Sequence, residues 1–163
     1  MRSLLVAAAG FICLSFAPAI SAESLELPYQ AVVHLTEEHH IDVTSEDKRR
    51  IGIAAFRGLA IFSGGELANY RYQGNYDFLG GSGPIRGYAI WQFDDGSLIR
   101  ATYVGKASRS GDGILFSGTH QIIAGSGRFA GASGSGTFEG RRVDNLDDGG
   151  DTYWSGSLSL TTP

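Results

Sequence analysis

The sequence predicts an all-β protein: an eight-stranded antiparallel up-and-down β-barrel that follows an N-terminal signal peptide. Three observations predict it. Glycine is abundant, with 24 residues against 4 prolines among 163, and the glycines separate short apolar or alternating runs, as in β-sandwiches and barrels. Most runs are joined by short turns, which make neighbouring strands antiparallel. Eight such strands in succession remove their exposed edges by closing into a barrel.

The N-terminal segment has the order of a cleavable secretory signal peptide. Met1-Arg2-Ser3 is a short positive start, Leu4 to Phe16 is apolar, and small residues follow up to Ala22. The apolar run is shorter than the roughly 20 residues of a membrane span, and no later segment is long and apolar enough to be one. We therefore expect a signal peptide over 1–22, a single domain over 23–163, and a secreted or periplasmic protein.

Composition excludes some partners. The net charge is −4 and no basic cluster occurs, which argues against nucleic acid and against anionic membrane surfaces as partners. The only cysteine, Cys13, lies in the segment to be removed. The exported chain would then have no disulfide, and its stability must come from burial and strand pairing. No residue pattern calls for a cofactor.

The elements can be placed in order along the chain. Tyr29 to Leu35 predicts a first strand, and the polar stretch His39 to Arg50 is compatible with a short helix capped by Thr44 or Ser45. Asp94-Asp95-Gly96-Ser97 predicts a tight hairpin turn, because Asp-Gly supplies positive φ angles. The remaining strands are expected near 51–62, 66–78, 85–94, 97–107, 113–124, 133–143 and 152–161.

Alternation assigns one apolar and one polar face to each strand. In 113–124, Phe116, His120 and Ile122 share a face opposite Thr119 and Gln121. The strands 66–78, 85–94 and 152–161 alternate in the same way. The sequence therefore predicts an apolar lumen and a polar exterior, unless the barrel forms a homo-oligomer. Glu139 and Arg100 fall on the polar faces of their strands.

One stretch resembles a known family. Gly125-Ser126-Gly127-Arg128-Phe129-Ala130-Gly131, continuing to Phe138, is similar to the "I-x-G-G-S/T-G-x-F-x-G-x-x-G" segment of the allene oxide cyclase and dirigent-like barrels. Gly87 to Ser97 resembles a strand–hairpin of small bacterial relatives. The resemblance covers roughly 85–140 and implies an eight-stranded antiparallel barrel with an apolar cavity. Members include a plant fatty-acid epoxide cyclase, proteins that steer the coupling of phenolic radicals, and polyketide cyclases. No catalytic residue of the plant cyclase is carried over to this chain.

The candidate ligand-binding residues are aromatic or imidazole side chains on the predicted inner face. Pockets are mostly apolar with a few placed polar groups, and tyrosine supplies both characters. His120 is also the weak candidate for a catalytic acid or base; a histidine satisfied by the core is its other interpretation. The set is Tyr70, Tyr72, Tyr76, Trp91, Phe116, His120 and Trp154.

Two acidic segments do not qualify as metal sites. Glu37 to Asp42 contains His39 and His40, but adjacent residues of a strand point to opposite faces. Asp144 to Asp151 places Leu146 where an EF-hand requires an oxygen ligand. We interpret both as solvated loops and expect no bound metal.

Three functions remain open. The first is an exported barrel that binds an apolar small molecule in its lumen, the second an isomerase or cyclase of the allene oxide cyclase type, and the third a structural or interaction protein with a filled lumen. An empty lumen of about 300 Å³ or more would support a ligand, whereas a filled lumen would favour the third. The sequence identifies neither the ligand nor the oligomeric state, and it leaves catalysis undecided.

Overall fold

The computed structural model describes residues 23–162 apart from 45, 47, 112 and 145, so the predicted signal peptide lies outside the described residues. Within these residues, eight strands and two short 3-10 helices follow one another. The strands are β1 (Glu23–Thr44), β2 (Arg49–Phe62), β3 (Leu67–Leu79), β4 (Gly83–Phe93), β5 (Leu98–Ser110), β6 (Gly113–Ser126), β7 (Ser133–Arg142) and β8 (Thr152–Thr162). The 3-10 helices are η1 (Gly127–Phe129), between β6 and β7, and η2 (Leu146–Asp148), between β7 and β8.

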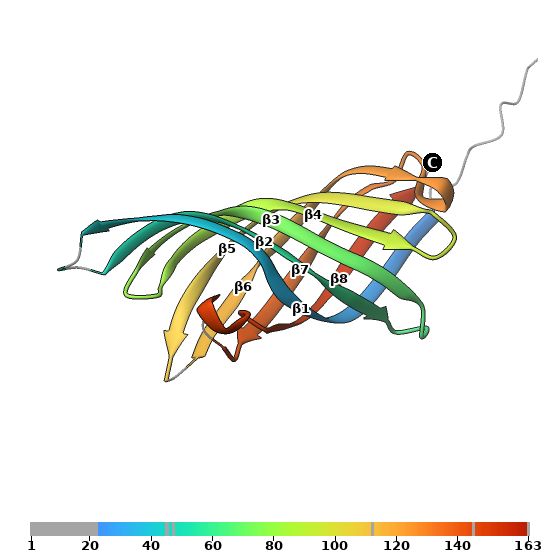
Figure 1. The fold of residues 1–163 in the computed structure, drawn as a ribbon. Coiled ribbons are helices and arrows are strands. Elements are labelled where there is room, and N and C mark those ends of the chain that lie inside the picture. The colour runs from blue at the N-terminus through green and yellow to red at the C-terminus, as the bar shows by residue number, and fades with distance from the viewer. Residues whose placement is uncertain (1–22, 45, 47, 112, 145, 163) are drawn as a thin grey trace, which may run out of the picture.

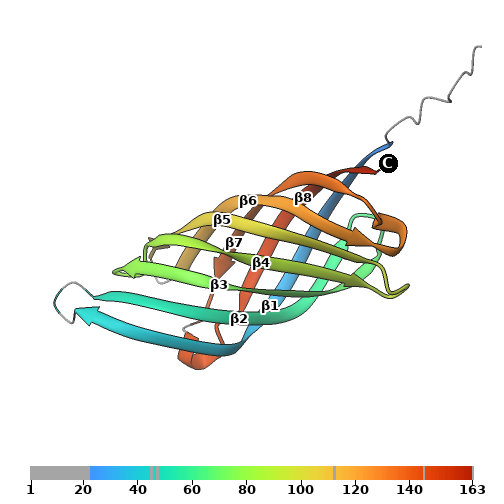
Figure 2. The ribbon, with the colours of Figure 1, turned by 90° about the horizontal axis from the view of Figure 1, so that it is seen from above.

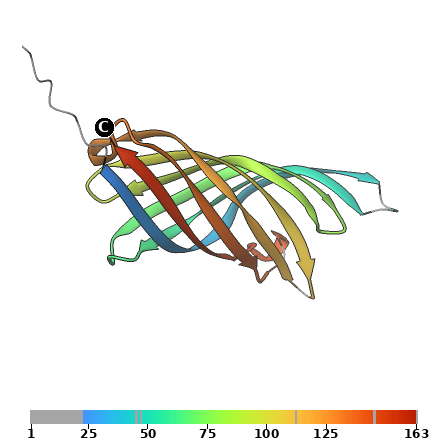
Figure 3. The same ribbon diagram turned by 180° about the vertical axis from the view of Figure 1, so that it is seen from behind.

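The strands form one closed barrel (Figures 1 and 3). Every strand pairs antiparallel with the strand that follows it, and β8 returns to pair with β1 from Glu23↔Thr162 to Val33↔Thr152. The predicted eight-stranded antiparallel up-and-down barrel is therefore confirmed. Four hairpins lie at one end of the barrel, which we call the open end: β1–β2, β3–β4, β5–β6 and β7–β8. The other three hairpins and the ends of β1 and β8 lie at the opposite end, which we call the closed end (Figure 2).

The short helix considered within 39–50 is wrong. β1 continues through this segment to Thr44, and β2 begins at Arg49, so the two strands form a long hairpin that reaches beyond the rest of the barrel (Figure 1). A bulge between Leu35 and Glu37 shifts the register, after which Ile41 pairs with Ile51. β-branched residues favour a strand, and their cross-strand pairing overrides the local helix signals.

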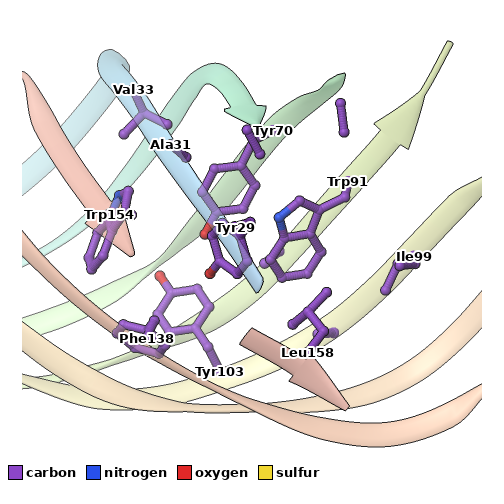
Figure 4. Close-up of a cluster of buried hydrophobic side chains, with 14 of the residues drawn as sticks. Tyr29, Ala31, Val33, Tyr70, Trp91, Ile99, Tyr103, Phe138, Trp154 and Leu158 are labelled. Carbon is purple, nitrogen blue, oxygen red and sulfur yellow. The ribbon is translucent and has the colours of Figure 1, made fainter. Parts of the chain in front are cut away.

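Alternation in the other strands is as predicted. In β4, Ala89, Trp91 and Phe93 are buried, whereas Tyr88 and Gln92 are exposed. Figure 4 shows part of the resulting interior, where rings from several strands meet. The rings that it labels are Tyr29, Tyr70, Trp91, Tyr103, Phe138 and Trp154.

Inward-facing glycines explain how so many rings fit into one barrel. A Cβ on Gly118 would lie 2.4 Å from Cζ of Phe138, its ladder partner, so the ring occupies the space that a side chain would fill. The same relation holds between several other ladder partners. They are Gly52 with Tyr76, Gly140 with Trp154, and Gly156 with Tyr29.

The glycine-rich segment of the family resemblance builds a plug at the closed end. Gly127 has φ +63°, a value that glycine adopts readily, and it starts η1, which buries Phe129 against Phe93 with ring centroids 5.0 Å apart. Arg128 covers both rings, with its Cζ 4.6 and 4.7 Å from their centroids, and forms an ion pair with Glu66. The closed end is therefore packed and capped.

The exterior is less polar than predicted. Val32, Leu59 and Tyr153 form one register row across β1, β2 and β8 and are 61%, 52% and 44% exposed. Ile61 and Leu67, which pair with each other across β2 and β3, add to this apolar patch. The prediction of a polar exterior is wrong there, and the homo-oligomer that would cover such a patch stays a prediction. Within the described chain, no helix has the length and apolar character needed to cross a membrane.

Candidate functional site

A narrow cavity enters the lumen from the open end and is walled mainly by aromatic rings. Six of the seven predicted site residues line it, brought together from β3, β6 and β8: Tyr70, Tyr72, Tyr76, Phe116, His120 and Trp154. Trp91, the seventh, is absent from the wall because it is fully buried and stacked on Tyr70, with centroids 5.0 Å apart. The predicted residues thus form one cluster, and a role for them in binding stays a prediction.

The cavity is small, at about 40 Å³, which is room for a few water molecules at most. The lumen is therefore mostly filled, well below the predicted threshold for a ligand. A wider hollow of about 520 Å³ lies over it at the open end and shares Tyr76, Phe78, Arg142 and Leu146 with it. We call it the mouth hollow. The mouth therefore offers space of ligand size, and the cavity is its deep, narrow extension.

His120 is buried at 3% exposure on the cavity wall. Its Nε2 lies 3.3 Å from the hydroxyl of Tyr29, and its ring is edge-on to Trp91. Burial lowers the pKa of His120 to about 4, so the imidazole is neutral near neutral pH. The Thr102 backbone opposes part of this shift. His120 Nδ1 nevertheless has no hydrogen-bond partner among the described residues. A neutral imidazole with a pKa this low is a weak base.

Two further polar atoms of the wall lack a hydrogen-bond partner within the described chain: the Tyr72 hydroxyl and the Trp154 Nε1. Burial raises the pKa of Tyr72, so its hydroxyl keeps its proton. Arg142, Trp154 and Thr152 oppose part of this shift, although neither Trp154 nor Thr152 is within hydrogen-bond geometry of the Tyr72 hydroxyl. A buried donor without a partner costs about 1–3 kcal/mol. The upper cavity wall therefore offers hydrogen bonds that the protein itself leaves unused.

Arg142 is the charged residue of the cavity wall, and the sequence analysis missed it, as it missed the rings of Phe56, Tyr103 and Phe138. It ends β7, is 7% exposed and lines both the cavity and the mouth hollow. The signal was present in the alternation, because Arg142 lies four residues after the inward Phe138 and so shares its face. Burial lowers the pKa of Arg142, and the nearby Tyr72 and Glu38 oppose the shift. Arginine remains protonated in proteins, so a fixed positive charge lies at the mouth.

Glu38 lies behind Tyr76, which lines the mouth hollow. The Tyr76 hydroxyl donates a hydrogen bond to the Glu38 carboxylate, and His40 Nδ1 lies 3.6 Å from the same carboxylate. Burial and this carboxylate raise the pKa of Tyr76. Glu38 follows the bulge of β1, which shifts the alternation so that its side chain is largely buried.

The acidic segment from Glu37 to Asp42 is part of β1, so its interpretation as a solvated loop is wrong: pairing with β2 holds it extended. His39 is exposed and pairs with Glu37, with 2.9 Å between His39 Nε2 and Glu37 Oε1. The other pair of this segment is His40 with Glu38. Among the residues that the structure describes, no group of three or more histidine, cysteine, aspartate or glutamate side chains is arranged to hold a metal ion.

Fold and site together define a class: a small closed antiparallel barrel with an aromatic lumen, capped at one end and open to a polar mouth at the other. Neither a protein-family model nor a curated protein matches the sequence. A solved structure of a pterocarpan synthase dirigent protein is similar, with a TM-score of 0.53 over 91% of this chain and 96% of that chain and 14% sequence identity. At this identity the likeness concerns the fold alone, which is similar to that of a dirigent protein.

Proposed function

We propose that this barrel binds an apolar, aromatic small molecule at its open end. The broad part of the ligand would lie in the mouth hollow and a slender part would enter the cavity. The observation that carries the proposal is the pairing of an aromatic wall with unpartnered donors, Tyr72 Oη and Trp154 Nε1, beneath a hollow of about 520 Å³. A ligand with a polar atom near these donors would remove their desolvation cost.

The two tryptophans give a direct assay. Trp154 lines the cavity and Trp91 does not, so the variant Trp91→Phe leaves a single reporter at the site. We expect the emission of this variant to shift when a ligand binds. The matched variant Trp154→Phe retains only Trp91 and should respond much less. An unchanged spectrum in the first variant with every aromatic probe would contradict the proposal.

Native mass spectrometry of the protein from its own host identifies the ligand. A complex with a small molecule that disappears on unfolding supports binding. A clean ligand-free mass, together with unresponsive fluorescence, would favour the alternative of a structural or interaction protein with a filled lumen.

A second candidate function is an isomerase or cyclase of the allene oxide cyclase type. The observation that favours it is His120, which lines the cavity with the Tyr29 hydroxyl 3.3 Å from its Nε2. This pair offers a proton acceptor and a proton donor in a site closed to most water. Binding ranks first because a pKa of about 4 makes His120 a weak base. Turnover of the co-purified molecule that is lost in His120→Gln would reverse this order.

Export is part of the same proposal and depends on residues 1–22 alone. N-terminal sequencing of the protein recovered from the periplasm or the medium should start at Glu23. Recovery of the full chain from the cytoplasm would contradict it.

A further inference from the structure

Arg142 has the surroundings of an anion-binding residue, but no carboxylate of the described residues is paired with it. Its guanidinium lies between two rings, with Cζ 5.3 Å from the centroid of Phe56 and 5.1 Å from that of Phe116. The rings belong to β2 and β6, which lie across the barrel from each other, and both rings line the cavity. They hold the flat guanidinium in place, and guanidinium stacks well on aromatic faces.

The charge of Arg142 has no ionic partner among the described residues. None of their carboxylates lies within the 4.0 Å of a salt bridge. Its hydrogen bond runs from Nε to Oγ1 of Thr152 and is long, at 3.5 Å. Glu38 is near enough to influence Arg142, but the carboxylate of Glu38 accepts the Tyr76 hydroxyl instead. A buried charge without a partner is costly.

The described lining of the mouth hollow does not supply a carboxylate partner for Arg142 either. It contains two carboxylates, Asp42 and Asp144, and Asp42 forms an ion pair with Arg50 at 2.9 Å. Lys48 and Arg109 add two cations to the same wall. Further carboxylates, such as those of Asp148 and Asp151, are exposed on the β7–β8 connection and do not line the hollow.

From this arrangement we infer that Arg142 selects ligands that carry a carboxylate on an aromatic or flat apolar body. The carboxylate takes two parallel hydrogen bonds from the guanidinium, the geometry that arginine provides best. The body lies in the mouth hollow, against the rings of Tyr76 and Phe78, and its narrow end points towards Trp154. This inference names the ligand class of the site and rests on the proposed function.

The test compares two ligands of nearly equal shape, cinnamate and the uncharged cinnamamide, by titration calorimetry at neutral pH. The full exported chain should bind cinnamate about ten- to a hundredfold more tightly, the range expected for hydrogen bonds to a charged group. Arg142→Gln should reduce this ratio to about one while retaining cinnamamide binding. Arg141→Gln is the matched control, because Arg141 is the exposed neighbour on the opposite face of β7, and it should retain the preference.

The outcomes separate the two proposals. Equal affinity for both probes in the unaltered protein, or a preference that survives Arg142→Gln, overturns the carboxylate inference and leaves lumen binding intact. Binding of neither probe overturns both. Should Arg142→Gln fail to fold, Arg142→Lys keeps the charge but loses the flat two-pronged donor, and the cinnamate preference should then fall several-fold. An unchanged preference in Arg142→Lys would show that charge alone attracts the ligand, against the stacked geometry argued here.

Discussion

Acidification should destabilise this barrel through His120, whose side chain is 3% exposed. In the folded chain its pKa is about 4, against 6.5 for an ordinary histidine. As the pH falls below 6.5, the unfolded chain takes up a proton that the folded chain refuses. The contribution of His120 to stability is therefore complete above pH 6.5, is lost between 6.5 and about 4, and falls no further below that. A pKa difference of this size corresponds to about 3 kcal/mol.

Urea unfolding at several pH values measures the effect, with His120→Gln as the variant that cannot titrate. The unfolding free energy of the unaltered protein should fall by about 3 kcal/mol more than that of the variant over this range. Asp42, Asp77 and Asp95 have lowered pKa values, so their stabilising effects are lost at more acidic pH and are common to both proteins.

His39→Gln is the matched control, because the His39 side chain is exposed and hydrogen-bonds to the likewise exposed Glu37. It should follow the pH dependence of the unaltered protein. Parallel curves for the unaltered protein and His120→Gln would refute the reasoning, since they would show that His120 is free to charge in the folded state.

Two further predictions concern packing. Gly118→Ala should destabilise the barrel by about 1–3 kcal/mol, because its Cβ would lie 2.3 Å from the Val104 carbonyl oxygen and 2.4 Å from the Phe138 ring. Gly64→Ala is the control: its Cβ would have no neighbour within 4 Å, so the variant should be nearly neutral in the same urea titration. Phe129→Ala should cost about 3–5 kcal/mol by emptying the plug, yet leave the affinity for cinnamamide within about twofold; a large loss of binding would show that the two ends are coupled.

The sequence predicted the strands and their inner faces well, because a period of two is a strong signal when one face is buried. Phe116 and His120 could be placed inside from alternation alone. The long β1–β2 hairpin was harder. Its charged segment from Glu37 to Asp42 has the composition of a loop, and it is held extended by pairing with β2, where Ile41 meets Ile51. That pairing is a tertiary contact that local composition does not report.

Arg142 and the width of the lumen were missed for different reasons. Alternation places Arg142 inside, but an arginine at a strand end is normally expected in solvent. What overrides this expectation is the pair of rings around it, Phe56 and Phe116, which come from strands far away in the sequence.

The width of the lumen depends on whether rings lie across it or along its wall. Glycines such as Gly118 decide that question, and only the ladder register shows which ring each glycine faces.

The two ends of the barrel differ in a way that stability alone does not explain. At the closed end Phe129 is buried, and Ser97 Oγ accepts the backbone N–H of Arg128, so packing and hydrogen bonding are both satisfied. Nearer the open end, Tyr72 and Trp154 carry buried donors without partners, and Arg142 carries a charge without one. A core optimised only for folding would replace these side chains with apolar ones of similar size. Trp91 Nε1 also lacks a partner among the described residues and lies outside the cavity wall, but the other unpaired groups line one cavity. A binding site requires such a cluster, because unpaired groups that cost stability in the empty barrel become contacts once a ligand arrives.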